Sequence, residues 1–206
     1  DTEEKEDDIL TGKFNGKNKL GVLGFSHTWQ MNEDMYLKSS LAATGSDNSS
    51  KFVVPNDAAE FDERERGNIG KSSLIAATTF NYKINTRHKI ETGLIFTRLN
   101  FNMTTYDWDA EQNELVNELS DKGHSSTLQA FTTWKYRISE SLTMISGVHY
   151  LHFALNNNYS IEPRFAMQWA MTERQSFNVG VGLHSKLEGV STYLAKRYAD
   201  NGTFIQ

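Results

Sequence analysis

The chain contains no cysteine among its 206 residues and only two prolines. Without thiolates it can form neither a disulfide framework nor a cysteine-ligated metal site. No segment approaches the ~18–20 consecutive apolar residues that a membrane-spanning helix needs, and the mean hydropathy is −0.56. A helical membrane protein is therefore excluded. A transmembrane barrel is not, because its strands of about 9–11 residues turn half of their side chains toward a polar interior.

A concentrated positive charge is also missing. The net charge is −5, and acidic residues gather at 1–8, 57–65 and 107–121. The absence of a basic stripe argues against nucleic acid as a partner. No signal peptide is recognisable at the first residue, so we expect either a mature form or a fragment.

What the chain does have is a repeated pattern of aromatic residues before turns. Four alternating apolar–polar runs end in aromatic or large apolar residues and then break at short polar turns, at 32–34, 85–87, 139–141 and 172–174. Short turns flanked by Trp and Tyr are typical of a membrane β-barrel, where these rings settle at the bilayer interface. We therefore expect all four turns at one end of the sheet, next to an outward-facing belt of interface aromatics. Its predicted members are Trp29, Tyr82, Trp134, Tyr136 and Trp169.

The alternation predicts an all-β fold, an antiparallel transmembrane β-barrel of about eight meander strands. The predicted strands are 20–31, 35–45, 73–84, 89–102, 127–138, 142–155, 160–171 and 176–187. Between them, 46–72 and 103–126 are predicted to be long loops, in which 111–119 could form a short helix or stay irregular. The whole chain, 1–206, is thus interpreted as one barrel segment. It consists of an acidic extracellular loop (1–18), eight strands (19–187) and a second extracellular loop (188–206).

Charged side chains fall on the strand face opposite the apolar one. A Lys or Arg facing lipid at mid-membrane would cost about 2–4 kcal/mol, so this face is predicted to line the lumen. The lumen-facing charges are Lys83, Glu91, Lys135, Arg137, Glu162 and Arg164. They could form a charge ladder that braces the wall, or they could contact a plug or substrate. Neighbouring strands are expected to bring opposite charges within reach of each other. Such cross-strand pairs contribute only about 0.2–1 kcal/mol, so Glu162→Gln is expected to change stability little.

Neither metal chemistry nor catalysis is indicated. His149 and His152 lie three apart and so face opposite sides of a strand; with His124 and His184 they are interpreted as isolated polar positions. An acidic run from Asp107 to Glu111 could bind Ca²⁺, but it lacks the glycine of an EF-hand loop, which favours a solvated acidic loop. With no catalytic triad, phosphate loop or paired carboxylates, we expect neither an enzyme nor a bound cofactor.

Five segments can be compared with known sequence families: YSIEPR (159–164), WAMTERQS (169–176), VGVGLHS (179–185), KIETGLIF (89–96) and YLHFALNN (150–157). They resemble segments of TonB-dependent outer-membrane receptors of the Bacteroidetes type. The order of turns and connections from residue 18 onward is similar as well. This resemblance implies a larger barrel of about 22 strands whose lumen is plugged by an N-terminal domain.

The resemblance also implies a function in transport. Such receptors take up a scarce or bulky nutrient across the Gram-negative outer membrane, with energy delivered through TonB. The implied partners are outer-membrane lipid, the remainder of the barrel, the plug domain, TonB acting through that plug, and a surface lipoprotein. No plug is recognisable here, so an internal barrel segment is expected. Two alternatives stay open: a self-contained eight-stranded barrel with a structural or passive-pore role, and a soluble β-sandwich binding module.

Overall fold

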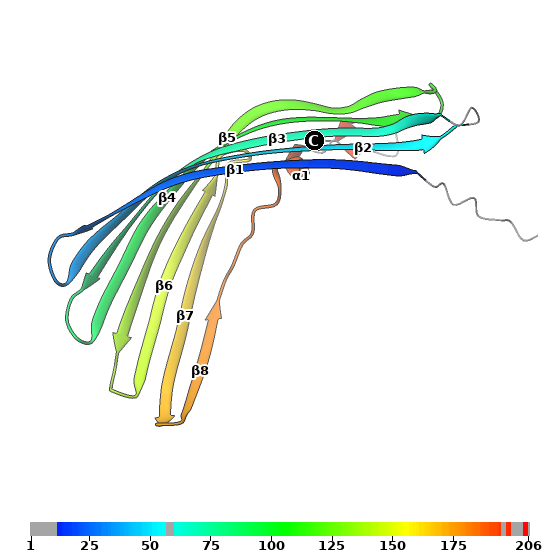
Figure 1. Ribbon diagram of the computed structural model, residues 1–206. Coiled ribbons are helices and arrows are strands. Elements are labelled where there is room, and N and C mark those ends of the chain that lie inside the picture. The colour runs from blue at the N-terminus through cyan, green and yellow to red at the C-terminus, as the bar shows by residue number, and fades with distance from the viewer. Residues whose placement is uncertain (1–11, 57–59, 195–196, 199–203, 206) are drawn as a thin grey trace, which may run out of the picture.

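The protein is one curved antiparallel sheet of eight strands in sequence order, β1 to β8 (Figure 1). The computed structural model describes residues 12–56, 60–194, 197–198 and 204–205. The strands are β1 (Lys13–Gln30), β2 (Met35–Pro55), β3 (Phe61–Lys83), β4 (His88–Asp109), β5 (Glu114–Arg137), β6 (Leu142–Phe153), β7 (Asn158–Thr172) and β8 (Gln175–Gly182). The predicted all-β meander is therefore confirmed.

The four predicted short turns all lie at one end of this sheet, at the lower left of Figure 1. All four hairpins are joined there by three backbone hydrogen bonds: Lys83 N–H donates to Asp34 O, Arg137 N–H to Arg87 O, and Ala170 N–H to Ser141 O. Main-chain hydrogen bonds thus hold neighbouring hairpins together at this end of the sheet. We call it the turn end, and the opposite end the far end.

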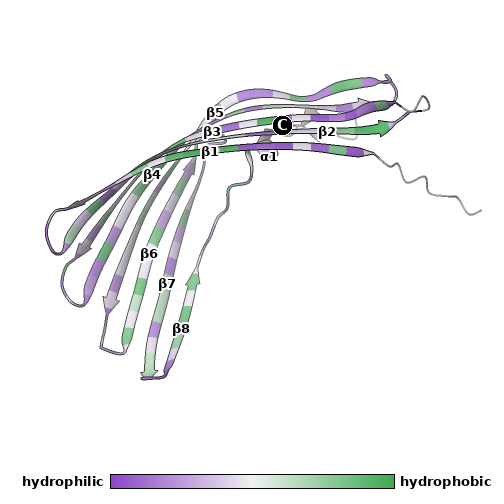
Figure 2. Cartoon of the chain, in the orientation of Figure 1, coloured by the Kyte–Doolittle hydropathy of each residue, from purple (hydrophilic) through white to green (hydrophobic). Residues whose placement is uncertain are grey.

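The cross-strand register assigns every side chain to one of two faces, because directly paired residues point to the same side of a sheet. One of them, which we call the outer face, carries a row of paired residues that crosses β1 to β5: Phe25, Leu41, Ala76, Phe96 and Leu128. The intervening residues point to the other face, which we call the concave face because the sheet curves around it (Figure 1). Apolar and polar segments alternate along the strands accordingly (Figure 2).

The strands are longer than the sequence predicted. Segments 46–55, 61–72 and 103–109 continue β2, β3 and β4, and β5 starts at Glu114, so the predicted long loops and the helix at 111–119 are wrong. Backbone pairing continues here through mostly polar residues, although Val53 and Met103 are buried, and the register shifts between Phe52 and Val53 and between Thr105 and Tyr106. Because apolar residues do not recur regularly on one face of these segments, the sequence pattern could not reveal the extensions.

The predicted terminal loops also differ from the structure where it describes them. β1 begins at Lys13, inside the predicted loop 1–18; residues 1–11 lie outside the described residues. The predicted loop 188–206 contains a short helix, α1 (Val190–Leu194), and a two-residue pairing of β9 (Arg197–Tyr198) with β10 (Phe204–Ile205). The predicted last strand also ends early, because β8 stops at Gly182 and residues 183–189 run as irregular chain.

A small buried core sits where this returning segment meets the concave face. Phe101 and Met103 of β4 pack against Val190 of α1, with Ile69, Leu99, Leu119 and Leu155 around them. The Tyr193 ring meets Phe153 edge-on at 5.2 Å. These contacts fold the segment after β8 under the extended strands, as Figure 1 shows for α1.

The sheet has two unpaired edges among the residues that the structure describes. β1 and β8 are its outermost strands, and no pairing joins them there. The eight strands also form a single layer, so the two facing sheets of a β-sandwich are not present in this part of the chain. Among these same residues, no helix is both long and apolar enough to span a bilayer.

Candidate functional site: the two faces of the wall

The five predicted interface aromatics share the outer face near the turn end. Tyr82, Ile90 and Trp134 are paired in one row, and Trp169 pairs with Leu142. Their rings are open to the surroundings, with Trp29 56%, Trp134 37% and Trp169 45% exposed. They do not pack into a core between sheets. Whether this belt meets a membrane interface stays a prediction.

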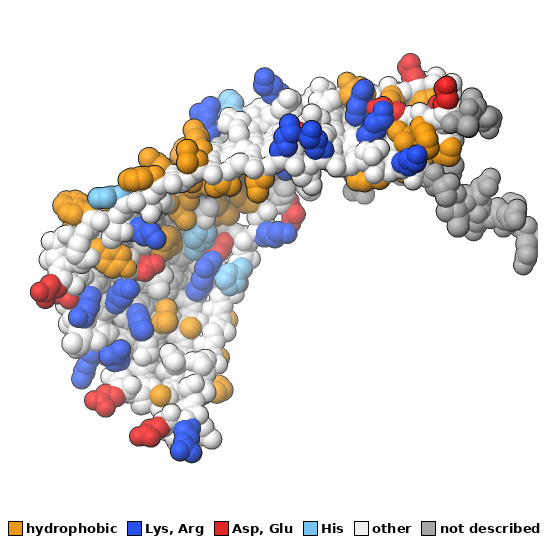
Figure 3. Space-filling view, viewed as in Figure 1, with side chains coloured by type: hydrophobic (Ala, Val, Ile, Leu, Met, Phe, Trp, Pro, Cys, Tyr) orange, Lys and Arg blue, Asp and Glu red, His pale blue; other side chains and the backbone are white. Residues whose placement is uncertain are grey.

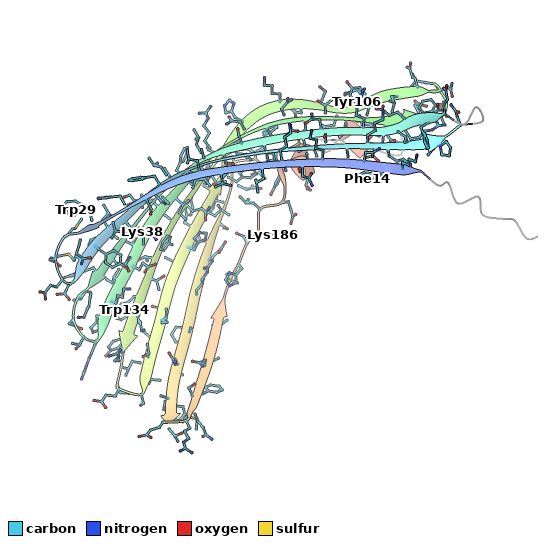
Figure 4. All side chains as sticks on the ribbon, in the orientation of Figure 1. Phe14, Trp29, Lys38, Tyr106, Trp134 and Lys186 are labelled. Atoms are coloured by element: carbon cyan, nitrogen blue, oxygen red, sulfur yellow. The ribbon has the colours of Figure 1, made fainter. Side chains whose placement is uncertain are left out.

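Part of the belt is a stacked aromatic ladder. The imidazole of His88 lies 4.5 Å from the Tyr136 ring and 5.7 Å from the Trp134 ring, all nearly parallel. Trp134 Nε1–H also donates to His88 Nδ1 at 3.2 Å. Sequence reasoning missed His88, which lies beside a turn. Figure 4 places Trp29 and Trp134 toward the turn end, with Phe14 and Tyr106 toward the far end.

The six predicted lumen-facing charges all share the concave face. Lys83 pairs with Lys89 and Lys89 pairs with Lys135, while Glu91 sits in the next row beside Asn81. The expectation that neighbouring strands would pair opposite charges is therefore wrong at this row, because the register places three lysines side by side. Figure 3 shows Lys and Arg gathered on this face toward the turn end.

Few carboxylates of the sheet lie close enough to neutralise this row of lysines. Lys83 reaches Asp34 at 3.6 Å between exposed side chains, and among the described residues no carboxylate lies within ion-pair distance of Lys89 or Lys135. Like charges directly opposite each other destabilise a sheet. The arrangement therefore favours an anionic group on the concave side.

Glu162 is the best-satisfied charge on the concave face. Its side chain is 3% exposed, and its carboxylate accepts from Arg164 at 2.7 Å, from Ser160 Oγ at 3.2 Å and from the Ser185 backbone N–H at 3.0 Å. The Ser185 hydroxyl also donates to it. Because Ser185 lies beyond β8, this carboxylate ties the returning segment to β7.

The network extends sideways through a histidine. His149 Nδ1 lies 3.2 Å from Glu162 Oε2, and its Nε2 lies 3.1 Å from Gln129 Oε1. The interpretation of His149 as an isolated polar position is therefore wrong. His152 points to the other face and contacts Asn157 Oδ1 at 3.0 Å, so the two histidines are separated as expected. Register pairs His149 with both Phe131 and Glu162, a contact that sequence spacing alone could not supply.

Acidic residues at the far end form a turn. The Asp109 carboxylate accepts from the backbone N–H groups of Glu111 at 2.8 Å and Gln112 at 3.1 Å, and from Gln112 Nε2 at 2.7 Å. These donors lower the pKa of Asp109, with the Gln112 backbone contributing most. Across the described part of the chain, no three His, Asp or Glu side chains are grouped so that they could hold a metal ion.

Comparison with known proteins identifies a structural relative. No protein-family model and no curated protein matches the chain. Among solved structures, the crystal structure of the ferric citrate transporter FecA in its unliganded form is similar, with a TM-score of 0.50 and 12% sequence identity over 82% of this chain. The chain spans 27% of the length of FecA. This likeness shows the fold: the eight strands have the arrangement of part of a transporter β-barrel.

Proposed function

We propose that the chain forms part of the barrel wall of a TonB-dependent receptor in the Gram-negative outer membrane, of the Bacteroidetes type that its sequence resembles. The observation that carries this proposal is the outer face, whose large apolar side chains lie open from β1 to β8. Leu23 is 77% exposed, Leu94 51% and Val181 73%. Water-soluble proteins rarely expose contiguous apolar patches larger than a few hundred Å².

The height of this apolar band fits a bilayer. From Ile90, in the Trp134 row, to Arg98, where charge first returns on the outer face of β4, there are eight residue steps. At ~3.4 Å per residue the strand rises about 27 Å, or roughly 20 Å across a membrane at a ~40° tilt. That is close to the ≈ 25 Å apolar band of outer-membrane barrels. The likeness to FecA supports the same interpretation.

Within this proposal the concave face lines the lumen, and its lysine row contacts anionic groups of a plug domain. The receptor takes up a scarce or bulky nutrient with energy transmitted from TonB through the plug, and a surface lipoprotein assists at the far end. The role of the chain is transport, and we propose no enzymatic activity for it. The short turns face the periplasm and the long extensions face the cell exterior.

Labelling of single cysteines tests the orientation, since the chain has none of its own. In intact cells, a membrane-impermeant maleimide should modify Ala110→Cys at the far end. It should reach Thr86→Cys, in a short turn, only after the outer membrane is permeabilised. The unsubstituted protein is the control. Labelling of both positions in intact cells, or of Thr86→Cys alone, would contradict the orientation.

A second experiment tests the facing of the wall. Spin labels at Leu94→Cys and Thr133→Cys sit on opposite faces of adjoining strands. In the reconstituted protein, the Leu94 label should be relaxed by oxygen, which concentrates in lipid. The Thr133 label should respond more to a water-soluble nickel chelate. Equal responses at both sites would reject a membrane wall.

A further inference from the structure

Two adjoining hollows lie on the outer face where the apolar band ends. The first, which we call the apolar trough, has a volume of about 680 Å³ and is bounded by side chains that include Leu23, Phe25, Leu74 and Phe96, with Arg98 at its rim. The second, the basic groove, has a volume of about 920 Å³ and lies farther toward the far end. Register makes them continuous, because Arg98 and Asn100 are successive outer-face residues of β4.

The basic groove carries polar and basic side chains over a floor of small residues. Its outer-face lining includes Lys19, Asp47 and Lys122, together with Gly21, Gly45 and Ser72. A Cβ added at Gly21 or at Gly45 would meet no atom within 4 Å. These two glycines therefore leave open space in the groove, whereas a larger side chain would occupy it.

The positive charges around the groove are uncompensated. Among the described residues, Lys19, Lys122 and Arg98 have no carboxylate within ion-pair distance, even though Lys19 pairs in register with Asp47. The side chains of all three are exposed. With one carboxylate in the lining and three basic groups at the groove and its rim, the balance favours an anion.

We propose that the trough and the groove together bind one phosphate-bearing lipid of the leaflet at the far end, with its acyl chains in the trough and its headgroup in the groove. The inference rests on the proposed membrane location. Arg98 lies roughly 20 Å above the aromatic belt, at the level of the opposite interface, and Lys19 and Lys122 lie two outer-face rows beyond it. Basic pockets at this level bind anionic headgroups.

The experiment measures lipid preference beside the groove. A bimane fluorophore is attached at Ser72→Cys in the purified protein, which is reconstituted into phosphatidylcholine vesicles. These vesicles contain either nitroxide-labelled phosphatidic acid or nitroxide-labelled phosphatidylcholine. Half-quenching by labelled phosphatidic acid should occur at a mole fraction at least about fivefold lower than half-quenching by labelled phosphatidylcholine. Fivefold is the factor that one Lys or Arg contributes to the binding of an anionic lipid at a membrane surface. Equal quenching by the two lipids would overturn the proposal.

Variants that remove charge from the groove or fill it test whether this site causes the preference for phosphatidic acid. The triple change Lys19→Gln, Arg98→Gln and Lys122→Gln should abolish it. A matched triple change on the concave face, Lys38→Gln, Lys89→Gln and Arg137→Gln, removes the same charge and should leave it intact. Gly45→Phe should also abolish it by filling the groove. If the concave-face triple is equally effective, general surface charge explains the preference and the site is rejected.

Two further measurements distinguish a lipid site from a site for free phosphate, and failure of the lipid site from failure of the proposed function. Excess inorganic phosphate should not displace the labelled lipid, because acyl chains hold it; displacement would show a site for free phosphate instead. Bimane at Leu94→Cys should be quenched by both lipids if the outer face meets the bilayer. Absence of that quenching would reject the proposed function itself, whereas its presence without preference at Ser72 would reject only the lipid site.

Discussion

Close approach between neighbouring strands leaves no room for a side chain at Gly93, on the concave face. A Cβ at Gly93 would lie 2.7 Å from Phe131 ring atoms and 2.7 Å from the Thr78 carbonyl oxygen. The ring can turn aside, but the carbonyl belongs to the sheet backbone and cannot. We expect Gly93→Ala to lower the free energy of unfolding by about 1–3 kcal/mol, the usual cost of overpacking.

Urea unfolding of the vesicle-reconstituted protein, followed by tryptophan fluorescence, measures this cost. Gly21→Ala is the matched control, since a Cβ there meets nothing within 4 Å. Its unfolding midpoint should stay within error of the parent protein. Equal losses in the two variants would show that crowding at Gly93 does not set the cost.

Burial changes what is expected of Glu162. Its carboxylate is almost inaccessible and accepts from donors on three side chains and one backbone N–H group, in addition to the contact with His149. An exposed cross-strand pair would contribute little. Here, by contrast, Glu162→Gln replaces one of the two accepting oxygens by an NH2 group. The donors that contacted this oxygen lose their acceptor, which costs about 1–3 kcal/mol.

The same unfolding assay tests this second substitution. Glu91→Gln is the control, because Glu91 makes no ion pair among the described residues. Limited proteolysis should also cut residues 183–189 faster in the Glu162 variant, since Ser185 loses its anchor. Unchanged stability together with unchanged proteolysis would show that the carboxylate is not what holds this segment.

At the scale of single elements, the turn between β4 and β5 should respond to pH. Backbone N–H groups of Gln112 and Glu111 lower the pKa of Asp109. A depressed folded pKa means that the stabilisation is fully present above the unfolded pKa and is lost as pH falls through the folded value. We expect the amide protection of residues 111–112 to be constant at neutral pH and to disappear only in strong acid.

Hydrogen exchange of the peptide spanning this turn measures the effect. Asp109→Asn is an informative control, because its side-chain oxygen still accepts but carries no charge. This variant should show lower protection at neutral pH and no acid transition. An acid transition that persists in Asp109→Asn would assign the titration to another group.

The sequence revealed some elements well and others poorly, for a physical reason. The turn-end halves of the strands could be predicted because one face must be apolar, which imposes a period of two on residues such as those of 89–96. The far-end halves, such as 61–72, keep the same backbone pairing with polar side chains on both faces, so no periodicity marks them. The Glu162–Ser185 contact was likewise invisible, because it depends on where the chain goes after β8.

The expectation that opposite charges pair across neighbouring strands was wrong for a similar reason. From the alternation of apolar and polar residues, Lys83, Lys135 and Glu162 could be predicted to lie on the same face of the sheet. The alternation could not predict their neighbours, because register depends on turn length and bulges and not on the pattern within one strand. Three adjacent lysines and one buried carboxylate therefore emerged only from the pairing.

At the scale of the whole molecule, the unpaired edges distinguish a wall segment from a closed small barrel. β1 and β8 lie at opposite ends of the strand order among the described residues, and open edges recruit further strands. We predict that these two strands are not neighbours in the native protein. Disulfide trapping can test this directly because the chain has no cysteine of its own.

Cysteine at Ser26 of β1 is combined in turn with cysteine at Asn178, Gly180 or Gly182, successive concave-face positions of β8, so that three closing registers are sampled. None of the three pairs should form an intramolecular disulfide under mild oxidation. The pair Thr132→Cys with Val148→Cys, directly opposite in β5 and β6, is the positive control and should cross-link, since paired strands bring Cβ atoms within about 4.5–5.5 Å. Efficient cross-linking of a β1–β8 pair would instead establish an eight-stranded barrel that closes on itself, and with it a structural or passive-pore role. Cross-linking of the control alone leaves both edges free for further strands, as a larger transporter barrel requires.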